Sequence, residues 1–243
     1  MERPPLRFEK SRGRTEVEIR RRILQAIFEQ RLPPGEKITE EQLATTFDVS
    51  RTVVRQAMAR LAQDGILVKS PNIGSTIAAP SRKEARDILA VRRMVEPDIV
   101  RILANTPARQ DVVSRLNRHL ALEDAARNSR NRGLQVRLSG EFHLLLAELA
   151  GNRILVRLMN QLQALTCLAI LLYAGGDEAC LPDEHNRIAS AIAAGDRTTA
   201  EKEMLHHLHH VEKDMNLDRG PDTAGFTEAI EWLRGHSGHG VEG

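Results

Sequence analysis

From Ser81 to Leu217 the apolar residues recur at α-helical spacing in six consecutive segments, and this repetition limits the possible folds more than any other feature. The segments cover roughly residues 84–104, 109–128, 132–150, 152–173, 183–194 and 197–217. They are joined by short connections rich in turn-forming residues, such as NTP, AGN and AGD. This arrangement predicts an antiparallel α-helical bundle. Aromatic residues make up only 3% of the chain, so the core must be largely aliphatic, which favours helices over a β-sandwich or barrel.

The first 79 residues predict three helices followed by a β-hairpin, which is the layout of a winged helix-turn-helix. The expected elements are a helix over 15–32, a short helix within 38–49 capped by Thr39, a helix from the N-cap Ser50 to about Gln63, and strands over 66–69 and 75–78. Proline and glycine at 33–35 end the first helix.

The predicted fold is therefore mainly α, with an N-terminal winged helix-turn-helix and a C-terminal antiparallel α-helical bundle. We expect a first domain over 1–79, a helical domain over 80–218 and a tail over 219–243. The tail is expected to contain one short helix at 226–234 and to be disordered at its end.

Charge and composition narrow the class of protein further. Residues 1–79 hold 14 Lys and Arg against 10 Asp and Glu, so the positive charge lies in the predicted winged domain. The N-terminus is polar and basic without an apolar signal region, and no run of about 18 apolar residues is present. Two cysteines, Cys167 and Cys180, do not form a disulfide framework. A cytoplasmic protein without a membrane partner is expected.

The third predicted helix has two different faces. At 100° per residue, Val54, Ala57, Met58 and Leu61 form an apolar arc that faces the core. The N-terminal half of the other face carries hydrogen-bond donors, namely Ser50, Arg51, Thr52 and Arg55. A solvated surface is one interpretation, but such surfaces normally mix both signs of charge. Hydroxyl groups and a helix N-terminus can bind phosphates, and an arginine can read guanine, so we interpret this segment as a DNA-recognition helix.

This region resembles the DNA-binding domain of the GntR family of bacterial transcriptional regulators. The matching motifs are PG at 34–35, LA at 43–44, VSRTVVRQAMARL at 49–61, glycine at 65 and the wing NIGSTI at 72–77. The resemblance implies that Arg51, Thr52 and Arg55 contact DNA, that Ser50 supports a phosphate and that Gly74 lets the wing enter the minor groove. Some relatives carry a basic residue early in the second helix, where this sequence has Glu40 and Glu41.

Three of the nine histidines lie on or beside apolar helix faces. His185 is at the centre of one stripe, His207 borders another, and His143 belongs to a helix that is apolar nearly all round. His206, His209 and His210 are expected to point into solvent. Each histidine could be a core residue bonded to backbone, but three on facing helices of one bundle favour a metal site. Neutral imidazoles suit Zn or Ni.

The second half resembles the FCD effector-binding domain of the FadR-type branch of the same family, through RRMVEPDIVRILA at 92–104, FHLLLAELAGN at 142–152 and 184–208. In metal-containing members an Asp four residues before the first histidine joins three histidines as ligands. His143, His185 and His207 match the histidines, but Ser139 occupies the Asp position. Glu141 cannot replace it easily, since it points about 160° away from His143 on a helix.

Three interpretations of the histidine site therefore remain open: a metal completed by water, a metal completed by the carboxylate of an effector, or a metal-free polar pocket. The resemblance gives Arg92 a pocket or structural role, and a surface or salt-bridge arginine is the alternative.

The leading hypothesis is a homodimeric repressor that binds a palindromic operator in double-stranded DNA. A small effector is expected to be a carboxylate that binds beside Arg92 and Ser139. Its binding would change the spacing or orientation of the two DNA-binding domains of the dimer. A metal-dependent enzyme is the alternative from another class, but the sequence has no H-E-x-x-H motif and no convincing nucleophile–base pair. An architectural DNA-binding protein without an effector is disfavoured, because a buried polar cluster reduces stability when it is not filled.

Overall fold

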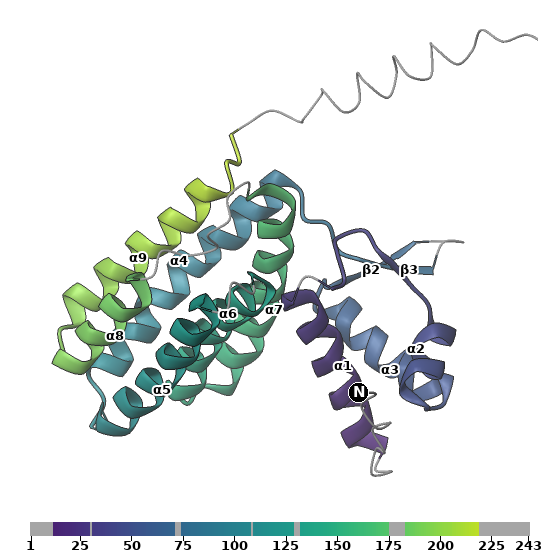
Figure 1. The fold of residues 1–243 in the computed structure, drawn as a ribbon, viewed down its shortest axis with the longest axis horizontal. Helices are drawn as coiled ribbons and strands as arrows, with labels where there is room; N and C mark the ends of the chain where they lie inside the picture. Colours follow the sequence, from purple (N-terminus) through teal and green to yellow (C-terminus); the bar gives the residue numbers. More distant parts are fainter. Residues whose placement is uncertain are drawn as a thin grey trace, which may run out of the picture.

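A computed structural model describes residues 12–29, 31–70, 74–107, 109–128, 132–174 and 183–218. In these residues a small N-terminal unit of helices and a short sheet lies beside a larger bundle of long helices (Figure 1). The mainly α fold predicted from the sequence is confirmed. Cys180 and the helix predicted at 226–234 lie outside the described residues.

The N-terminal unit is a winged helix-turn-helix, as predicted. Its elements are α1 (Arg12–Phe28), β1 (Lys37–Ile38), α2 (Glu40–Phe47), α3 (Arg51–Gln63), β2 (Leu67–Ser70) and β3 (Gly74–Ile77). The strands form an antiparallel sheet in the order β1-β3-β2, in which Val68 pairs with Thr76 and Lys37 pairs with Thr76 from the other side.

Strand β1 was missed by the sequence analysis, which placed Ile38 at the start of a helical segment. The Gly35 N–H donates to the Ile77 carbonyl and the Ile77 N–H donates to the Glu36 carbonyl, so the segment after the proline turn is held against β3. Ile38 is buried there. The helix begins only after Thr39, which forms the predicted cap as a capping box with Gln42.

The turn between α2 and α3 is short and depends on one left-handed residue. Asp48 ends α2 with φ 50°, which Asp tolerates better than most residues. Ser50 then precedes α3 in an extended conformation, and its hydroxyl makes no capping hydrogen bond. The Ser50 hydroxyl and the first backbone N–H groups of α3 are therefore not used by a side-chain cap.

The six predicted bundle helices are confirmed, with ends that shift by a few residues. They are α4 (Arg82–Ala104), α5 (Arg109–Asn128), α6 (Arg132–Leu149), α7 (Arg153–Tyr173), α8 (Glu184–Ala194) and α9 (Arg197–Asp214). Ser81 and Glu84 form a capping box at the start of α4, and Asn152 caps α7. Helix α4 packs along α9 and also contacts α6, α7 and α8, so one of its faces is covered by other bundle helices along most of its length.

The two parts share a continuous apolar core. Helix α1 packs against α3 on one side and against α6 and α7 on the other. Buried residues of α1 and α3 belong to the same cluster as Val136 of α6 and Cys167 of α7. Farther along, the Tyr173 hydroxyl donates to the Pro80 carbonyl at 2.8 Å, which ties the end of α7 to the segment between the two parts.

Helix α7 is long and apolar enough to meet the length and composition criteria for a membrane span. It nevertheless packs against α1, α4 and α6, and residues such as Met159, Thr166 and Leu168 are buried by those neighbours. Its apolar composition is thus explained by its place in the protein core.

Candidate functional site

The exposed face of α3 carries the donors that the sequence analysis assigned to DNA. Val54, Ala57, Met58 and Leu61 are buried, together with Val53, whereas Arg51, Thr52 and Arg55 are exposed. The helix therefore packs with its apolar arc inward and presents its N-terminal donors to solvent. A face of this kind has the size and chemistry to enter a DNA major groove.

Both arginines of this face are held by glutamates of α2. Arg51 Nη2 lies 2.7 Å from Glu41 Oε1, and Arg55 binds Glu40 through Nε and Nη2 at 2.8–3.1 Å. The Arg55 guanidinium lowers the pKa of the Glu40 carboxyl below its usual value. The two glutamates depart from the basic residue of some relatives, and their ion pairs were not predicted from the sequence. Residues 10 and 15 positions apart meet here only through the helix-turn-helix geometry.

Gly74, the predicted wing residue, begins β3 with φ 98°, a conformation that favours glycine. It is exposed, and a Cβ built there would lie 3.7 Å from Lys37 Cε. The wing therefore brings a lysine of β1 next to the glycine that the resemblance places near the minor groove.

His143, His185 and His207 meet inside the bundle, from α6, α8 and α9 respectively. All three are buried, and their candidate ligand atoms lie within 4.8 Å of one another. The His143 and His207 rings stack with centroids 5.0 Å apart. The structure thus brings together the three histidines that the sequence analysis selected.

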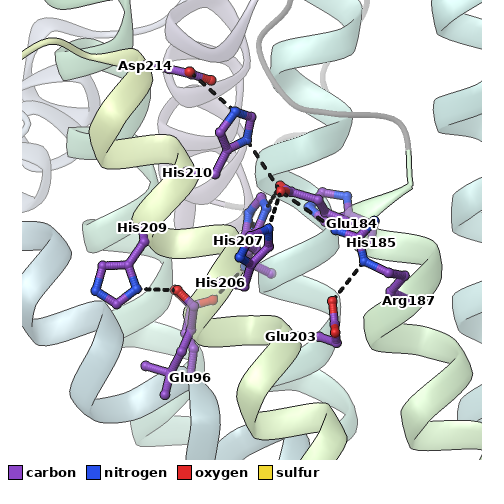
Figure 2. Close-up of polar contacts among 12 residues, drawn as sticks. Glu96, Glu184, His185, Arg187, Glu203, His206, His207, His209, His210 and Asp214 are labelled. Atoms are coloured by element: carbon purple, nitrogen blue, oxygen red, sulfur yellow. Dashed lines mark hydrogen bonds and ion pairs between the residues drawn. The ribbon is translucent and has the colours of Figure 1, made fainter.

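Each of these histidines has a buried glutamate at Nδ1. Glu96 of α4 lies 2.5 Å from His143 Nδ1, Glu123 of α5 lies 2.9 Å from His185 Nδ1, and Glu184 of α8 lies 2.8 Å from His207 Nδ1. Figure 2 shows the Glu184–His207 contact. A neutral imidazole that donates from Nδ1 presents a lone pair at Nε2, so the carboxylates select the tautomer that can bind a metal.

These glutamates were missed by the sequence analysis. The sequence offered one signal for them: Glu96 lies four residues after Arg92, and Glu184 directly precedes His185.

Burial opposes ionisation of Glu123, but His185 and His119 outweigh that effect and hold its pKa at about 2. Burial also lowers the pKa of His143, to about 3, against the opposing charge of Glu96. A neutral His143 ring beside an ionised Glu96 carboxylate suits metal ligation.

The Nε2 atoms of His143 and His207 lie 3.1 Å apart. Two nitrogens bound to one metal at about 2.0–2.1 Å, with bond angles between about 90° and 109°, are separated by about 3 Å. Beside them is a cavity of about 20 Å³, lined in part by Ser139, Arg92 and Gln163. That volume is enough for one water molecule or one ion.

The walls of this cavity contain two buried donors without a partner in the described part of the chain, Arg92 Nη2 and Gln163 Nε2. The rest of the Arg92 guanidinium binds Glu96 and Thr166, so Arg92 lines the cavity and also forms a buried ion pair. Half-buried Ser139 supplies a hydroxyl. The described residues that line this cavity thus supply donors but no carboxylate, and a buried donor is stabilised by a negatively charged acceptor.

The remaining histidines of α9 only partly follow the prediction. His206 and His209 are exposed, as expected, but His210 is half-buried. Its ring lies 3.4 Å from Glu184 on one side and 3.4 Å from Asp214 on the other (Figure 2). The prediction of a solvated His210 is therefore wrong, because its half-buried ring lies between the Glu184 carboxylate of α8 and Asp214.

His119, which the sequence analysis did not single out, is a core histidine. Its Nε2 lies 2.9 Å from the Leu138 carbonyl and 3.3 Å from Glu123. It positions the carboxylate that contacts His185 and is not part of the three-histidine group.

Comparisons with known proteins agree with both parts of the fold. Residues 15–77 match "Bacterial regulatory proteins, gntR family", and residues 87–210 match the FCD domain. Among curated relatives, the uncharacterized HTH-type transcriptional regulator YdhC of Bacillus subtilis is 28% identical over 76% of this chain and 83% of its own. The HTH-type transcriptional regulator LutR of the same species is 28% identical over 74% and 92%. The HTH-type transcriptional repressor RspR of Escherichia coli is 24% identical over 81% and 87%.

Solved structures show the same fold. A putative GntR transcriptional regulator from Rhodococcus sp. RHA1 matches with a TM-score of 0.72 and 23% identity, over 84% of this chain and 97% of that one. Escherichia coli McbR/YncC matches with a TM-score of 0.73 and 17% identity, over 84% and 98%.

Proposed function

The chain belongs to the GntR family of bacterial transcriptional regulators and carries that family's FCD domain, and on this basis we propose how it works. It is a DNA-binding transcriptional regulator. We propose that it is a homodimeric repressor, that a metal sits at the three histidines, and that a small carboxylate bound at this metal controls operator binding.

Recognition of DNA rests on α3 and the wing. Arg51, Thr52 and Arg55 are exposed on the first two turns of α3, where a recognition helix contacts base edges. Ser50 and the backbone N–H groups beside it suit a phosphate. Gly74 and the neighbouring Lys37 suit the adjacent backbone or minor groove.

The histidine site fits a divalent metal such as Zn or Ni. The ligands would be His143, His185 and His207. Their rings would be oriented by carboxylates at the Nδ1 atoms, which belong to Glu96, Glu123 and Glu184. When bound, such an ion supplies a positive charge and a Lewis-acidic position for an anionic ligand.

A carboxylate effector is supported by the unpartnered donors of the cavity. Arg92 Nη2 and Gln163 Nε2 are buried without an acceptor among the described residues, and Ser139 adds a hydroxyl at the position where the family resemblance implies an Asp. A carboxylate oxygen would satisfy these groups and complete the metal coordination. A cavity of about 20 Å³ holds one water molecule or one ion, so a carboxylate effector must move surrounding side chains when it binds.

The same cavity lies one layer of side chains from the DNA-binding unit. Gly140 and Cys167 line it, and a Cβ built on Gly140 would lie 3.7 Å from Cys167 Sγ and 3.8 Å from Phe28 Cε1. Phe28 is the last residue of α1, which packs against α3. Ligand binding can therefore shift the orientation of α1 and α3, which is the change an effector must cause.

Self-association is supported by the outer face of α4. Val91, Met94 and Ile102 fall within one arc of the helix and are 36%, 75% and 45% exposed. Met94 is the most exposed of the large apolar side chains in the described residues, and contact with a second copy would remove its apolar surface from water. A dimer would place two copies of α3 on the two halves of a palindrome.

The test is selection of duplex DNA from a random library with the purified protein, followed by binding measurements in the presence of chelator, Zn or Ni, and candidate carboxylates. We expect a palindromic site whose affinity changes with metal and carboxylate together. Selection of no sequence would overturn the proposal. The rival proposal, a metal-dependent enzyme, requires turnover of one of these carboxylates, and we expect none.

A further inference from the structure

The ion pairs between α2 and α3 lie on the surface that would face DNA, and packing does not require them. Helix α2 is held in place by half-buried Leu43, Ala44 and Phe47, which pack against the core of the N-terminal unit. The paired side chains are largely exposed: Arg51 and Glu41 at 61% and 74%, Arg55 and Glu40 at 64% and 35%. Exposed ion pairs contribute little to the free energy of folding, so a contribution to stability does not account for these contacts.

The pairs cancel the charge of the reading face. Arg51 and Arg55 carry two positive charges, and Glu40 and Glu41 carry two negative charges, on neighbouring turns of α2 and α3. Attraction between basic side chains and phosphates supplies nearly all of the affinity for non-specific DNA. A neutral reading face therefore lacks most of that attraction and repels phosphates that approach the two carboxylates.

Glu40 also fixes the direction in which Arg55 can donate. Its carboxylate accepts from Nε and Nη2 of Arg55, which occupies one edge of the planar guanidinium. The other edge, formed by Nη1 and the outer N–H of Nη2, is the one left for a base. This edge presents two parallel donors, the pattern that the O6 and N7 atoms of guanine accept in the major groove.

We propose that Glu40 and Glu41 determine DNA specificity by holding the two arginines of α3 away from phosphates and, for Arg55, by orienting the guanidinium toward a guanine. Glu41 lowers affinity for non-specific DNA, and Glu40 is in addition a positioning residue for base readout. This inference rests on the proposed DNA-binding function. It assigns a role in DNA recognition to Glu40 and Glu41, although their negative charge prevents them from contacting a phosphate directly.

The experiment compares Glu40→Gln and Glu41→Gln with the unchanged chain. Glu36→Gln is the matched control, since it removes one negative charge from an exposed glutamate of the same unit. The probes are the duplex selected by the unchanged chain and a random-sequence duplex of equal length, titrated at several salt concentrations. Thermal melting of each variant verifies the fold, which these exposed substitutions should preserve.

We expect Glu41→Gln to bind the random duplex several-fold more tightly, with a salt dependence steeper by about one unit, because a released arginine gains about one phosphate contact. We expect Glu40→Gln to lower the ratio of selected to random affinity by about tenfold, with lost discrimination at a guanine, as a bidentate contact would predict. Glu36→Gln should alter the ratio by less than twofold.

Two results would overturn the inference: unchanged ratios in both glutamate variants, or an equal change in Glu36→Gln, which would indicate a general effect of charge. Failure of the unchanged chain to select any sequence is a separate outcome, because it removes the proposed DNA-binding function before the variants are compared.

Discussion

His143 and His207 face each other through Nε2 atoms 3.1 Å apart, while a carboxylate lies at the Nδ1 atom of each ring. Two imidazoles that both donate from Nδ1 direct lone pairs at one another, which is unfavourable unless a cation lies beside them. The relationship between these two residues is the strongest structural argument for the proposed metal. The structure shows the positions of the nitrogen atoms that would bind the metal, whereas the sequence spacing indicates only which histidines could bind it.

The first prediction is metal content. Protein purified without chelator should carry about one Zn or Ni ion per chain, because three neutral histidines form one site. Removing the ion should lower the thermal stability, and adding it back at about 100 times the dissociation constant should restore about 2.7 kcal/mol. Elemental analysis and thermal melting measure both quantities. A metal-free protein that shows no thermal shift with either ion would exclude the site.

The second prediction concerns Ser139, which lines the cavity beside His143. Ser139→Asp should tighten metal binding by about tenfold or more, because a carboxylate adds an anionic ligand where a hydroxyl binds weakly. It should also reduce the dependence of metal affinity on added acetate, since the protein then supplies its own carboxylate.

Ser139→Asn is the control for this change, because it has nearly the same size without the charge. Calorimetric titration with Zn, with and without acetate, provides the measurement. Equal affinities for the Asp and Asn variants would show that position 139 does not face the metal.

The third prediction concerns the carboxylates behind the histidines. Glu123→Gln should weaken metal binding about 10- to 100-fold, because Glu123 orients His185 from 2.9 Å and is not itself among the proposed ligands. Glu148→Gln, an exposed change in the same bundle, should leave metal affinity unchanged. Competition with a chromophoric chelator measures both, and circular dichroism verifies folding. Equal metal affinity of Glu123→Gln and the unchanged chain would leave the carboxylates with a purely structural role.

The helices were predictable because their signals are local. Apolar spacing, capping residues such as Thr39 and Asn152, and short turns each act within a few residues of the chain. Strand β1 was not predictable for the opposite reason. Its two residues become a strand only through hydrogen bonds to β3, about 40 positions later in the sequence.

The residues of the candidate site also differ in whether their signals are local or depend on distant parts of the chain. The three histidines could be selected because each stands out against an apolar helix face, and the prediction that they meet is supported by their geometry. Glu123 and His185 are 62 positions apart, and nothing in either segment indicates that they pair. The same holds for Arg55 and Glu40, whose meeting requires the tight turn after α2.

The last prediction concerns Arg55, the exposed arginine in the middle of the proposed reading face. Arg55→Ala should weaken binding to the selected operator by about 1–3 kcal/mol and relax discrimination at one base pair, because a bidentate contact to guanine is lost. Arg60→Ala removes an exposed arginine from the C-terminal half of the same helix and should weaken binding less, without changing base preference. Titration of a set of operators substituted one base pair at a time measures both effects. A uniform loss across that set would identify Arg55 as a phosphate contact, and an unchanged affinity would remove it from the interface.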